Sequence, residues 1–166
     1  MPQQIAGTEV YVQSLAKALA KTGTESVVLI PNYHSTEEER YSYEGVQVIK
    51  YAEPSMIDRA LVAGERAPDG LKNFERILKE ISPSVVHFHE LAGSNGITHY
   101  HVKSARVAGY RIVMTFHIAK YSCRTGTLMY MNSEHCDGMI RVSKCSRCRM
   151  HDMGMSKFTS SLLKGE

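Results

Sequence analysis

Apolar runs of strand length recur along the first part of the chain. Residues 27–30, 85–89 and 111–117 are nearly continuous apolar runs, which is typical of strands buried on both faces of a sheet. Residues 46–51 are rich in β-branched and aromatic side chains and predict one more strand. Residues 32–44, between the strands predicted at 27–30 and 46–51, are polar and are expected to form a loop.

Three segments predict helices between the strands. In the first, Thr8 is a good N-cap, an apolar stripe follows at i, i+3, i+4 and i+7, and Gly23 closes the helix. A second stripe runs from Leu71 to Pro83, and residues 97–108 form the third helix. Strands and helices that alternate in this way predict an α/β fold, with a Rossmann-like parallel sheet covered by helices on both faces.

Polar residues end the predicted strands, and they are the first candidates for a binding site. Asn32 follows the first strand, His89 and Glu90 end the strand of residues 85–89, and His117 ends the last one. Ligands of an open parallel sheet bind beyond the carboxyl ends of its strands. We therefore expect a site at this edge.

Three other histidines are not expected to take part in this site. His87 alternates with His89, so we expect it to point into the helix layer and to be structural. His99 and His101 fall within the third predicted helix, and we expect them on its surface.

A glycine precedes the first predicted helix. Gly7 stands directly before Thr8, and Glu9 suits the first turn of a helix. Glycine lets a backbone approach a ligand closely, and a helix N-terminus attracts anions. We interpret Gly7 and Thr8 as a turn that faces a phosphate; the alternative is that Gly7 only starts the helix.

The four cysteines predict a metal site in a separate lobe. They all lie in a segment poor in aliphatic residues: Cys123, Cys136, Cys145 and Cys148. The pair in C-x-x-C spacing can reach one ion from a tight turn, and four thiolates complete a closed tetrahedral zinc site. An iron–sulfur cluster or free thiols remain alternatives, and His135 and His151 are possible substitute ligands. Without a metal or a cross-link, a lobe of this composition would fold poorly.

Charge and composition limit the partners and the cellular location that we expect for the protein. The net charge is +3, and from Lys120 onward eight Lys and Arg face four Asp and Glu, so the positive excess lies with the cysteines. Such a patch attracts phosphates or anionic surfaces. The chain has no apolar run near the ~20 residues that span a bilayer and no signal-peptide pattern. We expect a soluble, cytoplasmic protein, with association at a membrane surface as a further option.

Three motifs in order resemble those of retaining glycosyltransferases of family four, which have the GT-B fold. Residues 5–12 with 15–19 resemble that family's Gly-Gly-x-Glu loop and first helix, although the first glycine is Ala6 here. Residues 85–89 resemble its strand ending in His-x-His, and residues 113–117 its strand ending in Thr-x-His. The resemblance covers roughly residues 3–117. Certain members carry a similar cysteine insertion, with the Cys-x-x-Gly-Thr-Leu and Cys-Asp-Gly motifs that begin here at Cys123 and Cys136.

The resemblance implies an incomplete N-terminal half of a GT-B fold. Residues 1–117 would be the acceptor-side Rossmann-like domain, 118–155 a cysteine-rich metal-binding insertion and 156–166 a terminal helix. In the family, the glycine loop approaches the phosphates of the donor, so Gly7 and Thr8 would face a diphosphate. His117 would contact the transferred sugar or the acceptor, with His89 and Glu90 beside it. No catalytic base is implied.

The same resemblance implies the partners. They are a nucleotide-sugar donor, a sugar or lipid-linked acceptor, and a C-terminal Rossmann-like domain that this chain lacks, so we expect no activity from the chain alone. The first strand of the fold should precede Pro2, and its absence would expose a sheet edge open to homo-oligomers. An alternative from another class is a small zinc-bearing module that binds nucleic acid or protein. Nucleic acid is disfavoured, because the cysteine lobe has few aromatic side chains for base stacking.

Overall fold

The computed structural model describes residues 7–91, 97–119 and 122–155 of the chain. The chain divides into two compact units, Met1–Thr115 and Phe116–Glu166. The terminal helix expected over 156–166 lies outside the described residues, as do Ala6 and the residues before it. No helix in the described ranges is long and apolar enough to cross a membrane.

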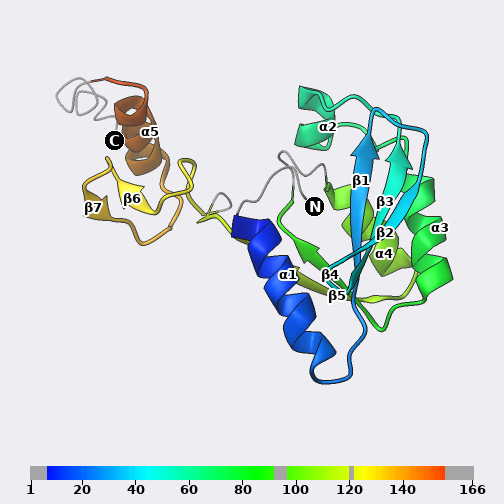
Figure 1. The fold of residues 1–166 in the computed structure, drawn as a ribbon. Helices are drawn as coiled ribbons and strands as arrows, with labels where there is room; N and C mark the ends of the chain where they lie inside the picture. Colours follow the sequence, from blue (N-terminus) through cyan, green and yellow to red (C-terminus); the bar gives the residue numbers. More distant parts are fainter. Residues whose placement is uncertain (1–6, 92–96, 120–121, 156–166) are drawn as a thin grey trace. The chain divides into compact units, whose positions relative to one another are not determined.

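Helices and strands alternate in the first unit, as the sequence predicts (Figure 1). In chain order its elements are α1 (Gly7–Ala20), β1 (Val27–Tyr33), β2 (Glu39–Tyr43), β3 (Val46–Glu53), α2 (Arg59–Ala63), α3 (Leu71–Ile81), β4 (Val85–His89), α4 (His99–Val107) and β5 (Arg111–Thr115). The second unit contains β6 (Met129–Tyr130), β7 (Glu134–His135) and α5 (Val142–Asp152).

The strands of the first unit form two hydrogen-bonded groups. One has the order β1-β3-β2, with β1 parallel and β2 antiparallel to β3. The other consists of the parallel pair β4 and β5, in which His89 is level with Thr115. The predicted parallel pairing is therefore present, and the α/β fold class is confirmed.

The expected loop at residues 32–44 is wrong in part, because it contains β2 and the end of β1. β2 is an outer strand with mostly exposed side chains, so it carries no apolar run that a sequence pattern could reveal. Pro31 does not end β1 as its position suggested. β1 pairs only with β3 among the described strands, and a strand at such an edge tolerates a residue without an N–H.

One hydrophobic core holds both groups of strands together. Its buried members come from β3, β4 and the helices α3 and α4: Ile49, Tyr51, Phe74, Ile77, Leu78, Val86, Phe88 and Ala105. The stripe predicted on α3 supplies three of them. Val27 and Leu29 of β1 and Ile112 and Met114 of β5 pack against this cluster.

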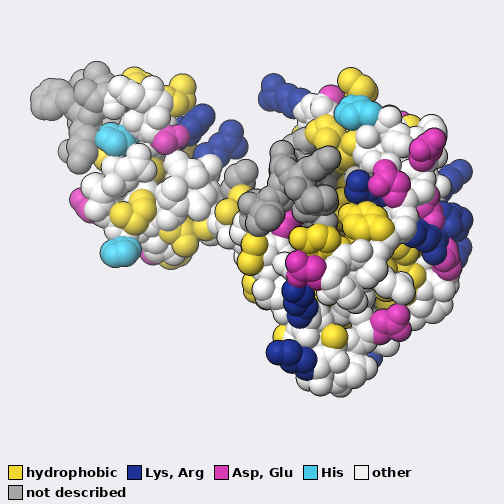
Figure 2. Space-filling view, in the orientation of Figure 1, with side chains coloured by type: hydrophobic (Ala, Val, Ile, Leu, Met, Phe, Trp, Pro, Cys, Tyr) yellow, Lys and Arg dark blue, Asp and Glu magenta, His cyan; other side chains and the backbone are white. Residues whose placement is uncertain are grey.

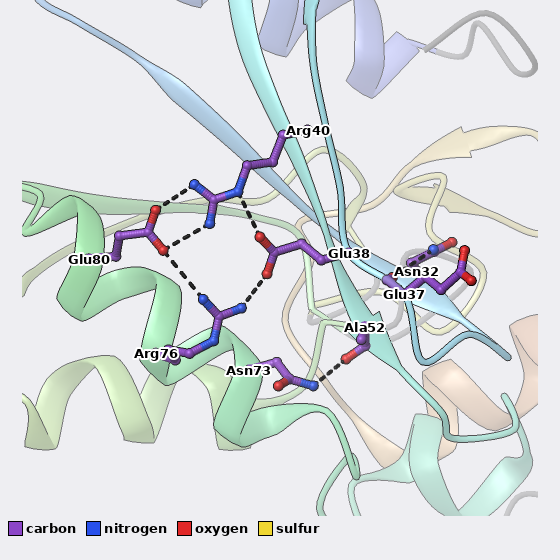
Figure 3. A network of polar contacts seen from close by, with 8 residues as sticks. All are labelled: Asn32, Glu37, Glu38, Arg40, Ala52, Asn73, Arg76 and Glu80. Carbon is purple, nitrogen blue, oxygen red and sulfur yellow. Dashed lines mark hydrogen bonds and ion pairs between the residues drawn. The ribbon is translucent and has the colours of Figure 1, made fainter.

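A network of charged side chains joins β2 to α3 at the surface. The Arg40 guanidinium bonds to both carboxylate oxygens of Glu80 at 2.5 and 2.8 Å, and Arg76 and Glu38 complete a closed ring of ion pairs (Figure 3). Figure 2 shows basic and acidic side chains mixed on the side of the unit where α3 lies. Because these groups are exposed, the ring adds little stability and mainly sets how β2 lies against α3.

His101 corrects a further prediction, because it is completely buried. Its Nδ1 accepts the Thr98 backbone N–H at 3.0 Å, in a capping box at the start of α4, so its Nε2–H donates to the Tyr51 hydroxyl at 2.9 Å. Burial lowers the pKa of His101 to about 4. The ring is thus a neutral part of the core and not a surface group.

Candidate functional site

The candidate site lies at the carboxyl end of β4. Val86 and Phe88 of this strand face the core, so His87 and His89 lie on the opposite face. The two imidazole rings are 4.1 Å apart between centroids. His87 therefore does not alternate with His89 as we expected, because residues two apart in a strand share one face.

The first helix lies against this histidine face. Tyr11 of α1 packs edge-on against the ring of His89, with centroids 5.7 Å apart. Tyr11 is one turn beyond Gly7, the first residue of α1, so the helix N-terminus lies near the end of β4. The face covered by α1 is opposite to the one covered by α3 and α4, which places helices on both sides of these strands.

Gly7 stands at an open position. An added Cβ there would meet no described atom within 4 Å. The backbone N–H groups of the first turn of a helix have no partner within the helix, and together with the helix dipole they favour an anion. Gly7 and Thr8 thus offer a surface that a phosphate group can approach closely.

Glu90 has an unusual backbone conformation next to His89. Its φ is 67°, in the left-handed region that costs a non-glycine residue about 1 kcal/mol or more. Its N–H donates to the Thr115 carbonyl at 2.9 Å, which holds this turn across to β5. Backbone strain of this kind is often found where a side chain must be aimed at a ligand.

Thr115 supports the site from β5, and sequence analysis missed it. Its Oγ1 lies 2.8 Å from Nε2 of His87, and its carbonyl holds Glu90. Tyr11 was missed as well. Both residues join the site only through tertiary contacts, which a local sequence pattern does not contain. The strand pattern held a signal for Thr115. In a parallel pairing of the two predicted strands, Thr115 comes level with His89 and lies on the same face as the two histidines.

Asn32, another predicted strand-end residue, lies away from this edge. It donates to the Glu37 carbonyl at 3.2 Å and to the Glu39 carboxylate at 3.3 Å, so it fastens the connection between β1 and β2 (Figure 3). His117 lies two residues beyond the end of β5, is half-buried and belongs to the second unit. Within the first unit, the structure brings His89 and Glu90 together with the start of α1.

A buried carboxylate at the end of β3 is structural. Glu53 is completely buried and accepts the backbone N–H groups of Ser55 and Gly70 at 3.0–3.1 Å. Tyr33 lies level with it on β1, and burial, followed by the charge of Glu53, raises the pKa of Tyr33 to about 12. These bonds tie the β3–α3 connection to the sheet.

The four cysteines lie together in the second unit. All are free thiols of intermediate exposure and line one small cavity. The Thr125 hydroxyl, 3.2 Å from the sulfur, is the main cause that lowers the pKa of Cys123 to about 7. In the described parts of the chain, no three His, Cys, Asp or Glu side chains are arranged so that they could hold a metal ion. The predicted zinc thus has no ready-made ligand cluster in its support.

The parallel strands, their helices and the polar edge define a Rossmann-like α/β protein. The chain belongs to Glycosyltransferase Family 4, whose sequence model matches residues 5–159. The chemistry of this family is glycosyl transfer. The match extends through the cysteine segment, beyond the motifs that carried the resemblance. No curated protein and no solved structure matches the chain.

Proposed function

We propose that this chain is the acceptor-side, N-terminal part of a GT-B glycosyltransferase that transfers a sugar from a nucleotide-sugar donor with retention of configuration. The observation that carries the proposal is the contact between Tyr11 and His89, because it brings the start of α1 to the carboxyl end of β4. An anion-binding helix end and a pair of histidines then border the same edge. Family membership supplies the reaction class.

The residues of this edge can stabilise a leaving diphosphate. Negative charge develops on the phosphate oxygens as the bond to the sugar breaks, and pre-oriented N–H groups at Gly7 and Thr8 would offset it without reorganisation. His89 can exchange hydrogen bonds with sugar hydroxyls, and the fixed backbone of Glu90 would keep its carboxylate at the edge. No residue is assigned as a catalytic base or nucleophile.

The remaining partners belong to the same proposal. A second Rossmann-like domain would hold the nucleotide, so this chain alone would not turn over substrate, and a sugar or lipid-linked molecule would be the acceptor. His117 would contact the sugar or acceptor in the assembled cleft. The zinc at the four cysteines would be structural and outside the transfer chemistry. The site of action would be the cytoplasm or the cytoplasmic surface of a membrane.

Inorganic pyrophosphate is a direct probe of the proposed phosphate turn. In ¹⁵N NMR titrations of the full chain, we expect the amides of Gly7, Thr8, His89 and Glu90 to shift together. Replacing Gly7 by proline should weaken the binding at least fivefold, since it removes an N–H and bars close approach. The control is Val107→Ala, a change at an exposed position at the end of α4, which should leave binding unchanged.

Two results would reject the proposal. One is a response confined to the basic residues of the second unit. The other is strong, salt-dependent binding of generic RNA or DNA by that unit, which would favour the nucleic-acid module instead.

A further inference from the structure

The described part of the second unit has no hydrophobic core. None of its described residues, 116–119 and 122–155, is buried. Large apolar side chains lie at its surface instead, with Ile140 71% and Val142 83% exposed, and Figure 2 shows hydrophobic side chains on the outside of this unit. A lobe of this size without a core needs a cross-link or a metal ion to stay folded.

The four cysteines line one cavity of the second unit. They come from three separate places: Cys123 from a turn, Cys136 from the residue after β7, and Cys145 with Cys148 from one face of α5. All four line a cavity of ≈ 20 Å³, together with Met129 and Tyr130. That volume accommodates about one water-sized particle. The cavity thus has the size of a single ion, and this favours one ion over an iron–sulfur cluster of several atoms.

Polar groups lie beside two of the sulfur atoms. The Thr125 hydroxyl lies 3.2 Å from the Cys123 sulfur. The Met131 N–H donates to the Cys148 sulfur at 3.4 Å, and Lys144 lines the same cavity as the cysteines. Donors of this kind stabilise sulfur in its charged form and orient it, which is what outer groups do around metal ligands.

We propose that Cys123, Cys136, Cys145 and Cys148 bind one Zn²⁺ together and that this ion takes the place of a core in the second unit, so that the unit folds only when loaded. The proposal deepens the structural zinc named under the proposed function. In the metal-free chain the described residues form no complete ligand cluster. Loading would draw the sulfurs to about 2.3 Å from the ion and release the four thiol protons to solvent.

Lys144 would offset part of the negative charge of the loaded site without binding the ion. Four thiolates around a divalent cation leave two negative charges, and Lys144 lines the cavity of the cysteines while its ammonium is paired with Asp137 at 3.2 Å. Its stem also lies near Tyr130, with Nζ 5.6 Å from the ring centroid. Lys144 is thus a positioning residue that offsets the charge of the site without touching the ion.

Cobalt titration of the full reduced chain tests the proposal. We expect one Co²⁺ per chain with thiolate-to-metal absorption of tetrahedral geometry, displaced by one Zn²⁺. Cys148→Ser should weaken Zn²⁺ binding by at least ~10-fold, and Lys144→Gln by ~10-fold or less. Ser146→Ala on the exposed side of α5 is the matched control and should bind as the native chain does.

Hydrogen exchange gives a readout independent of metal spectroscopy. Amides of residues 122–155 should lose protection in chelator and regain it with Zn²⁺, while those of β3, β4 and α3 should not change. Four titratable thiols in excess Zn²⁺, or a second unit that stays protected in chelator, would overturn the proposal. So would disulfides or iron–sulfur absorption in the native chain. The pyrophosphate shifts at Gly7 and His89 are measured on the same sample, so each proposal can fail without the other.

Discussion

At the scale of single residues, His101 shows most clearly that the hydrophobic pattern along the chain does not reveal the burial of a polar side chain. Helical periodicity located its helix correctly, but its burial depends on Tyr51 of β3 and on the cap at Thr98. A Thr followed three residues later by a side chain that can accept an N–H is the local signal of such a cap. Read in that way, the sequence would have suggested a capping role, though not the contact with Tyr51.

The buried imidazole predicts loss of stability in acid. Its folded pKa of about 4 lies below the ordinary value of 6.5, so the unfolded chain takes up the proton first. Stability from this group is complete above about pH 6.5 and is lost as the pH falls toward 4, by roughly 3 kcal/mol in total. Urea unfolding at several pH values measures it.

A pair of histidine variants isolates this effect. His101→Gln should be less stable at neutral pH and should have a flatter pH dependence between 4 and 6.5. The exposed His135→Gln should keep the native slope. An unchanged slope in His101→Gln would assign the acid sensitivity to other groups.

At the scale of elements, the connection between β3 and α3 depends on close backbone packing. A Cβ added at Gly70 would lie 2.5 Å from the Ala52 carbonyl oxygen and 2.6 Å from the Glu53 carboxylate, which is completely buried. Neither neighbour can move without breaking the bonds that Glu53 accepts. The φ of Gly70 is −78°, which any residue can adopt. Glycine is therefore required here because there is no space for a Cβ, and not because of the backbone conformation.

Gly70→Ala should destabilise the first unit by about 1–3 kcal/mol, the usual cost of overpacking. Gly7→Ala serves as the matched change, because its Cβ would enter open space at the start of a helix. Urea unfolding followed by the far-UV signal compares the two. Equal stability of both variants would mean that the loop around Gly70 yields more easily than its contacts suggest.

The elements that could be predicted are those with buried stripes or runs. β3, β4, β5, α1 and α3 follow from such patterns because a core face selects them directly. β2 and α5 do not, since β2 is mostly exposed and α5 buries none of its residues. For the site, strand ends located His89 and Glu90, while Tyr11 and Thr115 belong to it only through packing between distant segments.

At the scale of the whole molecule, the strand pairing leaves four edge strands among the described strands of the first unit. β1 and β2 bond only to β3, and β4 and β5 bond only to each other. All seven residues of β1 are only half-buried, although four in succession are apolar. Unpaired backbone groups on such strands are templates for association with another chain.

We expect the purified chain to associate as its concentration rises. Light scattering across a range from micromolar to millimolar should show a growing mean mass. The Zn²⁺-loaded and chelator-treated chains should behave alike if association occurs through the first unit. A constant monomer mass over the whole range would contradict this prediction.

The contact between Tyr11 and His89 joins an early segment of the chain to one far along it. The proposed phosphate-binding edge needs both α1 and β4, so we expect a peptide copy of either element alone not to bind pyrophosphate. During synthesis the edge would come into existence only after the ribosome has released both segments. During unfolding, recognition would vanish with the tertiary contacts even while much of the helix content persisted.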